Sequence, residues 1–414
     1  MAKVFIEETT LTAIGDAIRG KTGKTALIDP ANMSTEIAGI EAGGGGGGDI
    51  PEEAFTLSGD CAYKFSGTGW NWFLDMYGSR ITTSNLRQIN NMFYNNSTIK
   101  SIPFTLNIIS DSEWTPSNLT NVFTNTDNLE VCPKIRGNIN WKYSSTSLEN
   151  LIYIVAKLRS LDDLFTSEML TGFQNYICTS TYSMPSVSKL IQNVYSLRKM
   201  PDWFYNFKLN PESTVFPNYT SCIYYCLVGG CYALDEIKNI PVWHCQGAQT
   251  GNMFNGAFDN CWRLQSLTFE TNPDGTSIKT NWKGQTIDLK GGSYAYKPVG
   301  YGQGMASANF ASGRLNPGIT YDKEVVDDAT YQALKNDPDW FTDKLEYSRY
   351  NHDSAVETIN SLPDTSEYLA SAGGTNTIRF GGTAGSLTDG GAINTLTEEE
   401  IAVAAAKGWT VAIA

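Results

Sequence analysis

A short unit recurs along this chain, and its repetition constrains the fold more than any other feature. The first copy, residues 86–103 (LRQINNMFYNNSTIKSIP), combines a short helical turn, a polar corner and an extended piece, each with one apolar face. Such a unit cannot bury its own apolar side chains, so it needs copies stacked beside it. Three copies share one spacing, in which an apolar residue is followed six positions later by another and then, after four more, by proline: Phe93, Ile99 and Pro103; Phe123, Leu129 and Pro133; Ile191, Leu197 and Pro201.

Partial copies extend this pattern. One covers residues 158–165, a second keeps only its tail at 234–241, and a third keeps its front at 258–269. Because the intervals between copies vary, the pattern predicts an irregular solenoid of short strands and short helices with inserted loops over residues 51–287. The predicted fold class is α+β.

The segments before and after the repeats differ from them in composition. Residues 1–42 predict two short amphipathic helices, which need a partner because helices of this length are marginal alone. Residues 43–50 contain six consecutive glycines and are expected to be a linker. Residues 288–350 are rich in Gly and Tyr, which indicates a long insertion of the kind that often carries function.

Residues 351–414 predict a C-terminal repeat and an α/β cap. A helix is expected at 353–362, with Val356 and Ile359 inward, and a strand at 376–380. Thr397 followed by Glu400 is the pattern of a capping box, which predicts a helix with Ile401, Ala404 and Ala405 inward. Residues 409–413 predict a closing strand. Such a cap would seal the open end of a solenoid.

Charge and hydropathy exclude some classes of partner. The 414 residues carry a net charge of −13 and a pI near 4.7, which disfavours nucleic acid and anionic lipid surfaces as ligands. The sequence has no run of about 18 apolar residues, so no membrane span is predicted. Acidic residues interrupt the N-terminus where a signal peptide needs an apolar core, so synthesis in a cytoplasm without export by that route is expected.

One phosphate-binding motif occurs in an unsuitable context. Gly15–Thr22 (GDAIRGKT) matches the P-loop pattern, which must follow a buried strand and precede a helix that starts at the lysine. Here the first glycine falls inside an amphipathic helical turn, and the helix is expected to end at Gly20. The context favours a helix end over nucleotide binding, and no cofactor is predicted.

Six of the eight cysteines lie between Cys178 and Cys261. The spacings of Cys222, Cys226 and Cys231 are looser than the paired knuckles of structural zinc sites. Buried free thiols that pack as small hydrophobic groups are therefore expected, ahead of a zinc site or a disulfide.

Catalytic constellations are weak in this sequence. There are only two histidines, and the neighbours His352, Asp353 and Ser354 are expected to diverge, with Asp353 or Ser354 capping the following helix. Acidic pairs such as Asp162 and Asp163 are typical of solvated faces. The prediction is that the protein is not an enzyme, although sequence does not reveal a sugar-cleaving site built from distant carboxylates.

Aromatic residues form three groups. Trp70, Trp72, Phe73 and Tyr77 are expected to be core, and so are the aromatic residues near the fifth copy. In the Gly-rich insertion, tyrosines among Gly and Ser resemble an adaptable recognition surface. The candidate receptor-binding residues are, from the insertion and the fifth copy, Tyr294, Tyr296, Tyr301, Tyr224, Tyr225 and Trp243.

Two kinds of resemblance cover most of the chain. NNMFYNNSTIKSIP and GAFDNCWRLQSLTF resemble the irregular BspA-like leucine-rich repeats of bacterial surface proteins. LTAIGDAIRGKTGKTALIDPANMSTEIAGI and LTEEEIAVAAAKGWTV are similar to the two ends of bacteriophage tail-fibre proteins, and these ends are the more specific signal.

The resemblance implies a virion structural protein of the tail. Its N-terminal module would attach to other tail or baseplate proteins, and its body would bind a glycan or protein receptor on the bacterial surface. A homotrimer is the expected oligomer. The alternatives are a bacterial surface adhesin with the same repeats, which lacks support from a signal peptide, and a surface-polysaccharide depolymerase.

Overall fold

The computed structural model describes residues 55–109, 118–142, 146–180, 185–289, 352–380 and 396–413, apart from positions 195, 232, 233, 248, 250, 260, 262, 263 and 265. The chain divides into two units, Met1–Thr56 and Leu57–Ala414, and nearly all described residues belong to the second. The predicted helical module, the glycine linker and the Gly/Tyr-rich insertion lie outside the described residues, except for Asp288 and Leu289.

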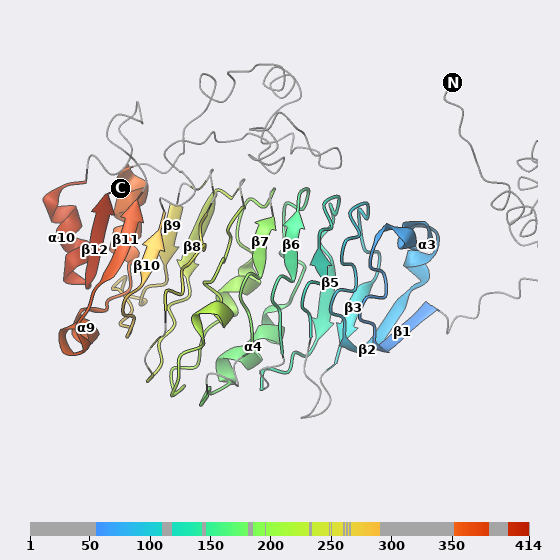
Figure 1. Cartoon of the computed structure of the whole chain (residues 1–414), viewed down its shortest axis with the longest axis horizontal. Coiled ribbons are helices and arrows are strands. Elements are labelled where there is room, and N and C mark those ends of the chain that lie inside the picture. Colours follow the sequence, from blue (N-terminus) through green and yellow to red (C-terminus); the bar gives the residue numbers. More distant parts are fainter. Residues whose placement is uncertain are drawn as a thin grey trace, which may run out of the picture. The chain divides into compact units, whose positions relative to one another are not determined.

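The described residues form a mixed α/β structure of short parallel sheets and few helices (Figure 1). The strands are β1 Thr56–Asp60, β2 Thr82–Gln88, β3 Thr105–Ile108, β4 Phe123–Thr124, β5 Lys134–Gly137, β6 Ile152–Val155, β7 Ile191–Val194, β8 Glu236–Ile240, β9 Ser266–Phe269, β10 Thr286–Asp288, β11 Asn376–Phe380 and β12 Trp409–Ile413. The α-helices are α3 Asn71–Tyr77, α4 Ser167–Asn175, α8 His352–Ser361, α9 Ser366–Ala372 and α10 Glu398–Ala406, and the 3-10 helices are η3 Thr68–Trp70, η4 Gly78–Arg80, η5 Asp202–Asn206 and η6 Tyr219–Ser221.

The strands make four sheets, in the orders β1-β2-β3-β5, β4-β6-β7, β8-β9 and β10-β11-β12. Pairing is parallel from β2 to β5 and throughout the other three sheets. The pairs join corresponding segments of successive copies: Phe123 lies opposite Ile152, and Ile152 lies opposite Ile191. Each copy therefore supplies the neighbour that the next one needs.

A second set of backbone bonds joins the corners of successive copies. We call each corner segment a rung; the first is residues 61–67. Its alternate N–H groups, at Tyr63, Phe65 and Gly67, donate to carbonyls of the next rung, at 3.2, 2.8 and 2.8 Å. The N–H groups between them, at Lys64 and Ser66, donate within their own turn. All the backbone donors from 63 to 67 are thus satisfied without an extended strand.

This geometry needs a left-handed backbone at two places in each rung. The residues two before and two after the central apolar residue have positive φ, a conformation that Asn and Gly tolerate best. The pairs are Tyr63 and Gly67, Asn91 and Asn95, Asn121 and Asn125, Asn150 and Ile154, Lys189 and Asn193, and Cys226 and Gly230. Asparagine amides also join rungs directly, since Asn125 Nδ2 donates to Asn95 Oδ1 at 2.6 Å.

The central residues and the residues six positions later build the core. Phe93 stacks on Phe65 at 5.6 Å and on Phe123 at 5.7 Å between ring centroids. The spacing of six also holds in copies that seemed incomplete in the sequence. The paired buried residues there are Ile152 and Leu158, Val228 and Leu234, and Phe258 and Leu264.

The C-terminal cap follows most of its sequence predictions. Thr397 and Glu400 form the predicted capping box, and both strands, β11 and β12, span the predicted residues. Ala404 is buried, but Ala405 is exposed and Ile401 only half-buried, so the inner face of α10 is narrower than predicted. In α8, Ile359 is buried and Val356 is half-buried.

Ile154 offers a test of the left-handed corner. It is a β-branched residue at φ 57°, where other rungs carry Asn or Gly. We expect Ile154→Asn to raise the free energy of unfolding by about 1 kcal/mol, because the left-handed conformation is costly for a β-branched residue, whereas Asn tolerates it through local hydrogen bonds of its short side chain. Urea unfolding would measure this, with Asn125→Ile as the reciprocal control that should destabilise. Loss of stability in Ile154→Asn would contradict the assignment.

Candidate functional site

The candidate residues from the fifth copy are largely core. Tyr224 is fully buried and Trp243 is 1% exposed, and their ring centroids lie 5.3 Å apart. The backbone N–H of Trp243 donates to the Tyr224 hydroxyl at 3.0 Å. These two side chains therefore present no surface to a receptor, so the prediction that they bind one is wrong. Their burial agrees with the expectation that the aromatic residues near the fifth copy are core. Tyr225 is half-buried, with Lys189 Nζ 5.7 Å from its ring centroid. Tyr294, Tyr296 and Tyr301 lie outside the described residues.

The aromatic group before the first full copy is the one that reaches the surface. Trp70 is 39% exposed and Trp72 is 61% exposed, so the prediction that they are core is wrong. Phe73 is the hub of this group. Its ring centroid lies 6.4 Å from Phe65, 6.1 Å from Trp70, 5.8 Å from Trp72 and 5.4 Å from Tyr77. We call these five residues the aromatic end cluster.

Local sequence explains why this cluster faces outward. Gly67, with φ 74°, ends the first rung, and η3 and α3 follow at once. Only Leu74 of the seven α3 residues is buried. The helix is held at its end by Gly78, where a Cβ would come within 2.5 Å of the Pro103 side chain. A helix fixed by one leucine and one glycine leaves Trp72, Asp75 and Met76 exposed and Phe73 and Tyr77 half-buried.

The exposed apolar side chains are concentrated here. Tyr63, at 57%, and Met76, at 64%, add to the two tryptophans. The other large apolar side chains exposed in the described ranges are single: Val131, Ile177 and Val403. A terminal repeat ordinarily carries a polar outer face for solubility, so a group of exposed rings beside the first rung marks a contact surface.

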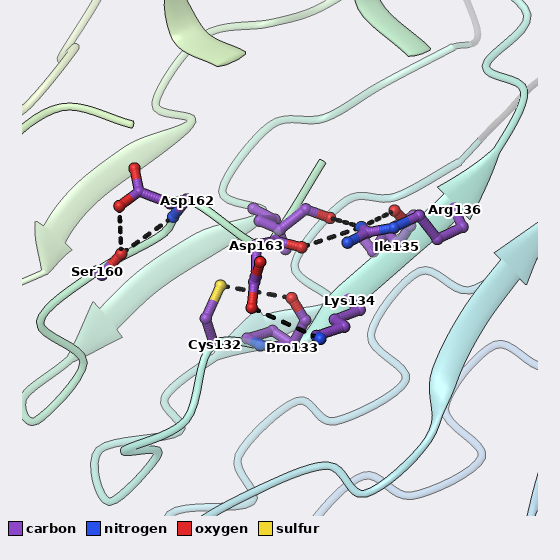
Figure 2. A network of polar contacts seen from close by, with 9 residues as sticks. Cys132, Pro133, Lys134, Ile135, Arg136, Ser160, Asp162 and Asp163 are labelled. Atoms are coloured by element: carbon purple, nitrogen blue, oxygen red, sulfur yellow. Dashed lines mark hydrogen bonds and ion pairs between the residues drawn. The ribbon is translucent and has the colours of Figure 1, made fainter. Parts of the chain in front are cut away.

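A charged group on the strand surface is, by contrast, internally compensated (Figure 2). Lys134 Nζ lies 3.6 Å from Asp163 Oδ2, and Arg136 donates to the carbonyls of Asp163 and Leu164 at 2.9 and 3.2 Å. Asp162 Oδ2 accepts from Ser160 at 2.9 Å in the same view. These contacts join β5 to the following copy, so they stabilise stacking and leave few charges free for a ligand.

The thiols lack the character of nucleophiles. Burial raises the pKa of Cys132, Cys222 and Cys231 to about 12 and that of Cys245 to about 11, so these four are protonated near neutral pH. All eight cysteines are free, and six are buried, which confirms the expected packing as small hydrophobic groups. No group of three His, Cys, Asp or Glu side chains in the described ranges is arranged to hold a metal ion.

Two carboxyls stand out by their environment. Burial raises the pKa of Asp127 to about 6. The pKa of Asp259 is also raised, mainly by burial and further by the charge of Asp288. Asp288, in turn, lies 3.6 Å from Arg379 Nη1. Sequence gave no sign of the Asp259 and Asp288 pair, because the two residues are distant along the chain.

His352 has a structural position. Its Nδ1 lies 3.1 Å from Asp353 Oδ1 and its Nε2 lies 3.2 Å from Glu400 Oε2. The expectation that the neighbours His352 and Asp353 diverge is therefore wrong. The contact of His352 with Glu400 links α8, which begins at His352, to α10. Ser354 is buried. Asp353 lies in the first turn of α8, where its charge favours the helix.

No described helix is long and apolar enough to cross a membrane. Comparisons with models of protein families, with curated proteins and with solved structures gave no match to this chain.

The aromatic end cluster predicts a contrast between two substitutions. Phe73→Ala should lower the free energy of unfolding by about 2 kcal/mol, because Phe73 is half-buried among four rings. Trp72→Ala should change it by less than about 0.5 kcal/mol, as for an ordinary exposed position. Chemical denaturation of both variants measures the difference. Equal, large losses would mean that Trp72 serves folding alone.

The link between α8 and α10 predicts a pH dependence. Asp353 and Glu400 raise the pKa of His352 above 6.5, and hydrogen bonds, first from the Thr397 backbone, lower that of Glu400 below 4.5. The histidine's contribution is present below pH 6.5 and is lost as pH rises through its folded pKa; the glutamate's is lost as pH falls through its own. His352→Ala should therefore lower the melting temperature more at pH 5.5 than at pH 8.5. An equal decrease at both would contradict the link.

Proposed function

We propose that this chain is a phage tail-fibre or receptor-binding protein that attaches the virion to the bacterial surface by non-covalent binding. The described body would be an irregular leucine-rich-repeat solenoid, which supports the proposal through its stacked rungs and parallel strands. The observation that carries the proposal is the exposed aromatic end cluster, an apolar contact surface where a terminal repeat needs a polar one.

The proposed arrangement divides attachment and recognition between segments. Residues 1–42 would bind other tail or baseplate proteins, and the six glycines would tether the body to them. Several copies on one virion, arranged as homotrimers, would multiply a modest affinity for each site. The tyrosines of the insertion, Tyr294, Tyr296 and Tyr301, remain candidates for additional receptor contacts.

A second candidate, a surface-polysaccharide depolymerase, has one observation in its favour. Burial and the charge of Asp288 raise the pKa of Asp259, and Asp288 lies 3.6 Å from Arg379 Nη1, so two carboxyl groups that interact electrostatically are present, as glycoside hydrolysis requires. Incubating the protein with bacterial surface polysaccharide and assaying released oligosaccharides separates the two functions. If the wild-type protein releases oligosaccharides and the Asp259→Asn variant does not, the protein acts by cleavage and not by adhesion.

Adhesion predicts a defined response to substitution in the aromatic end cluster. Labelled full-length protein should bind susceptible cells and compete with phage adsorption, whereas Trp70→Ala/Trp72→Ala should bind at least about tenfold more weakly, as expected when two hot-spot rings are removed. Ile177→Ala is the matched control, because Ile177 is a single exposed apolar residue elsewhere.

The triple variant of Tyr294, Tyr296 and Tyr301 tests the insertion in the same assay. Wild-type protein that neither binds susceptible cells nor competes with phage would refute attachment as its function. Binding that survives the double tryptophan variant but not the triple tyrosine variant would place the receptor contact in the insertion instead.

A further inference from the structure

The seven tryptophans that the structure describes fall into two groups by the hydrogen bonding of their indole N–H. Five buried indoles each donate to a backbone carbonyl at 2.6–3.2 Å: Trp141 to Met169, Trp203 to Leu161, Trp243 to Phe207, Trp282 to Trp243, and Trp409 to Pro363. Trp70 and Trp72 have no such acceptor among the residues that the structure describes. The surface therefore offers two rings and two available donors.

Two exposed rings together with two indole N–H donors favour a partner that has both apolar and polar groups. A wholly apolar partner would bury the two N–H groups without acceptors, which is costly. The partner must bring apolar patches for the rings and hydroxyl or carbonyl oxygens for the donors. A pyranose has both, since its axial C–H groups form an apolar face and its hydroxyls lie around the edge.

Charge narrows the choice further. Four exposed charged side chains lie in or beside the first rung or α3, and they balance: Asp60 and Asp75 are acidic, and Lys64 and Arg80 are basic. The chain as a whole carries −13. The cluster thus has no local excess of positive charge to attract an anionic sugar, and the net negative charge of the chain disfavours one, so a neutral sugar is the better ligand.

We propose that the aromatic end cluster is a binding site for a neutral saccharide, with a pyranose stacked on Trp72 and hydroxyl oxygens accepting from the indole N–H groups of Trp70 and Trp72. Phe73 positions both rings through its edge-on contacts at 6.1 and 5.8 Å. This inference deepens the proposed attachment function, on which it rests, by naming the class of receptor.

The test is a calorimetric titration of the full-length chain with three neutral oligosaccharides: cellohexaose, maltohexaose and hexa-N-acetylchitohexaose. We expect at least one to bind, and we expect Trp72→Ala to weaken binding about tenfold or more. Trp72→Phe keeps a ring but removes the N–H, so it should fall between wild type and Trp72→Ala. Ile177→Ala should bind like wild type.

Three outcomes overturn the saccharide site. One is the absence of binding of all three oligosaccharides by the wild type. Another is unchanged affinity in Trp70→Ala/Trp72→Ala. The third is a double variant whose sedimentation shows loss of an oligomer while sugar affinity is unchanged, which would make the cluster a contact between copies. Adsorption of the wild-type protein to cells is a separate measurement, so attachment can stand when the saccharide site fails.

Discussion

The hydrogen bonds between successive rungs are the constraint on which the rest of this structure depends. Alternate N–H groups of one rung donate to the next, and the groups between them are satisfied locally. This pattern requires two left-handed residues at a fixed separation in every rung. Backbone geometry is therefore repeated more faithfully than side-chain identity, which is why Ile154, Lys189 and Cys226 occupy positions where Asn is the more suitable residue.

Repetition of the backbone also determines how the aromatic residues are used. The aromatic rings of the central residues in successive rungs lie close enough to stack, as Phe65, Phe93 and Phe123 do. Indoles that enter the core find backbone carbonyls of nearby copies as acceptors, such as Leu161 for Trp203. Within the described residues the series begins at the first rung, and no earlier described copy covers the rings that follow it. Exposure of Trp70 and Trp72 is thus a consequence of their position in the series.

Sequence predicted the features that depend on local spacing. The spacing of six, the capping box at Thr397 and the strand at 409–413 each involve residues that are close together in the sequence, so the sequence pattern predicts them. Burial was less predictable, because α3 has the composition of a core helix but only one inward residue, Leu74. The Asp259 and Asp288 pair was not predictable at all, since it depends on an electrostatic interaction between residues in separate segments.

The distribution of charge bears on how such a protein could recognise a surface. Many of its few cations are engaged with acids of neighbouring copies, as Lys134 is with Asp163, Lys157 with Glu130 and Lys199 with Asp162. Exposed pairs of this kind add little stability, and the chain as a whole keeps a net charge of −13. The long-range electrostatic interaction with an anionic bacterial surface is therefore unfavourable, and at physiological salt it is screened within about 8 Å. Recognition must then depend on short-range contacts, and the exposed rings of Trp70 and Trp72 are the described groups best suited to make them.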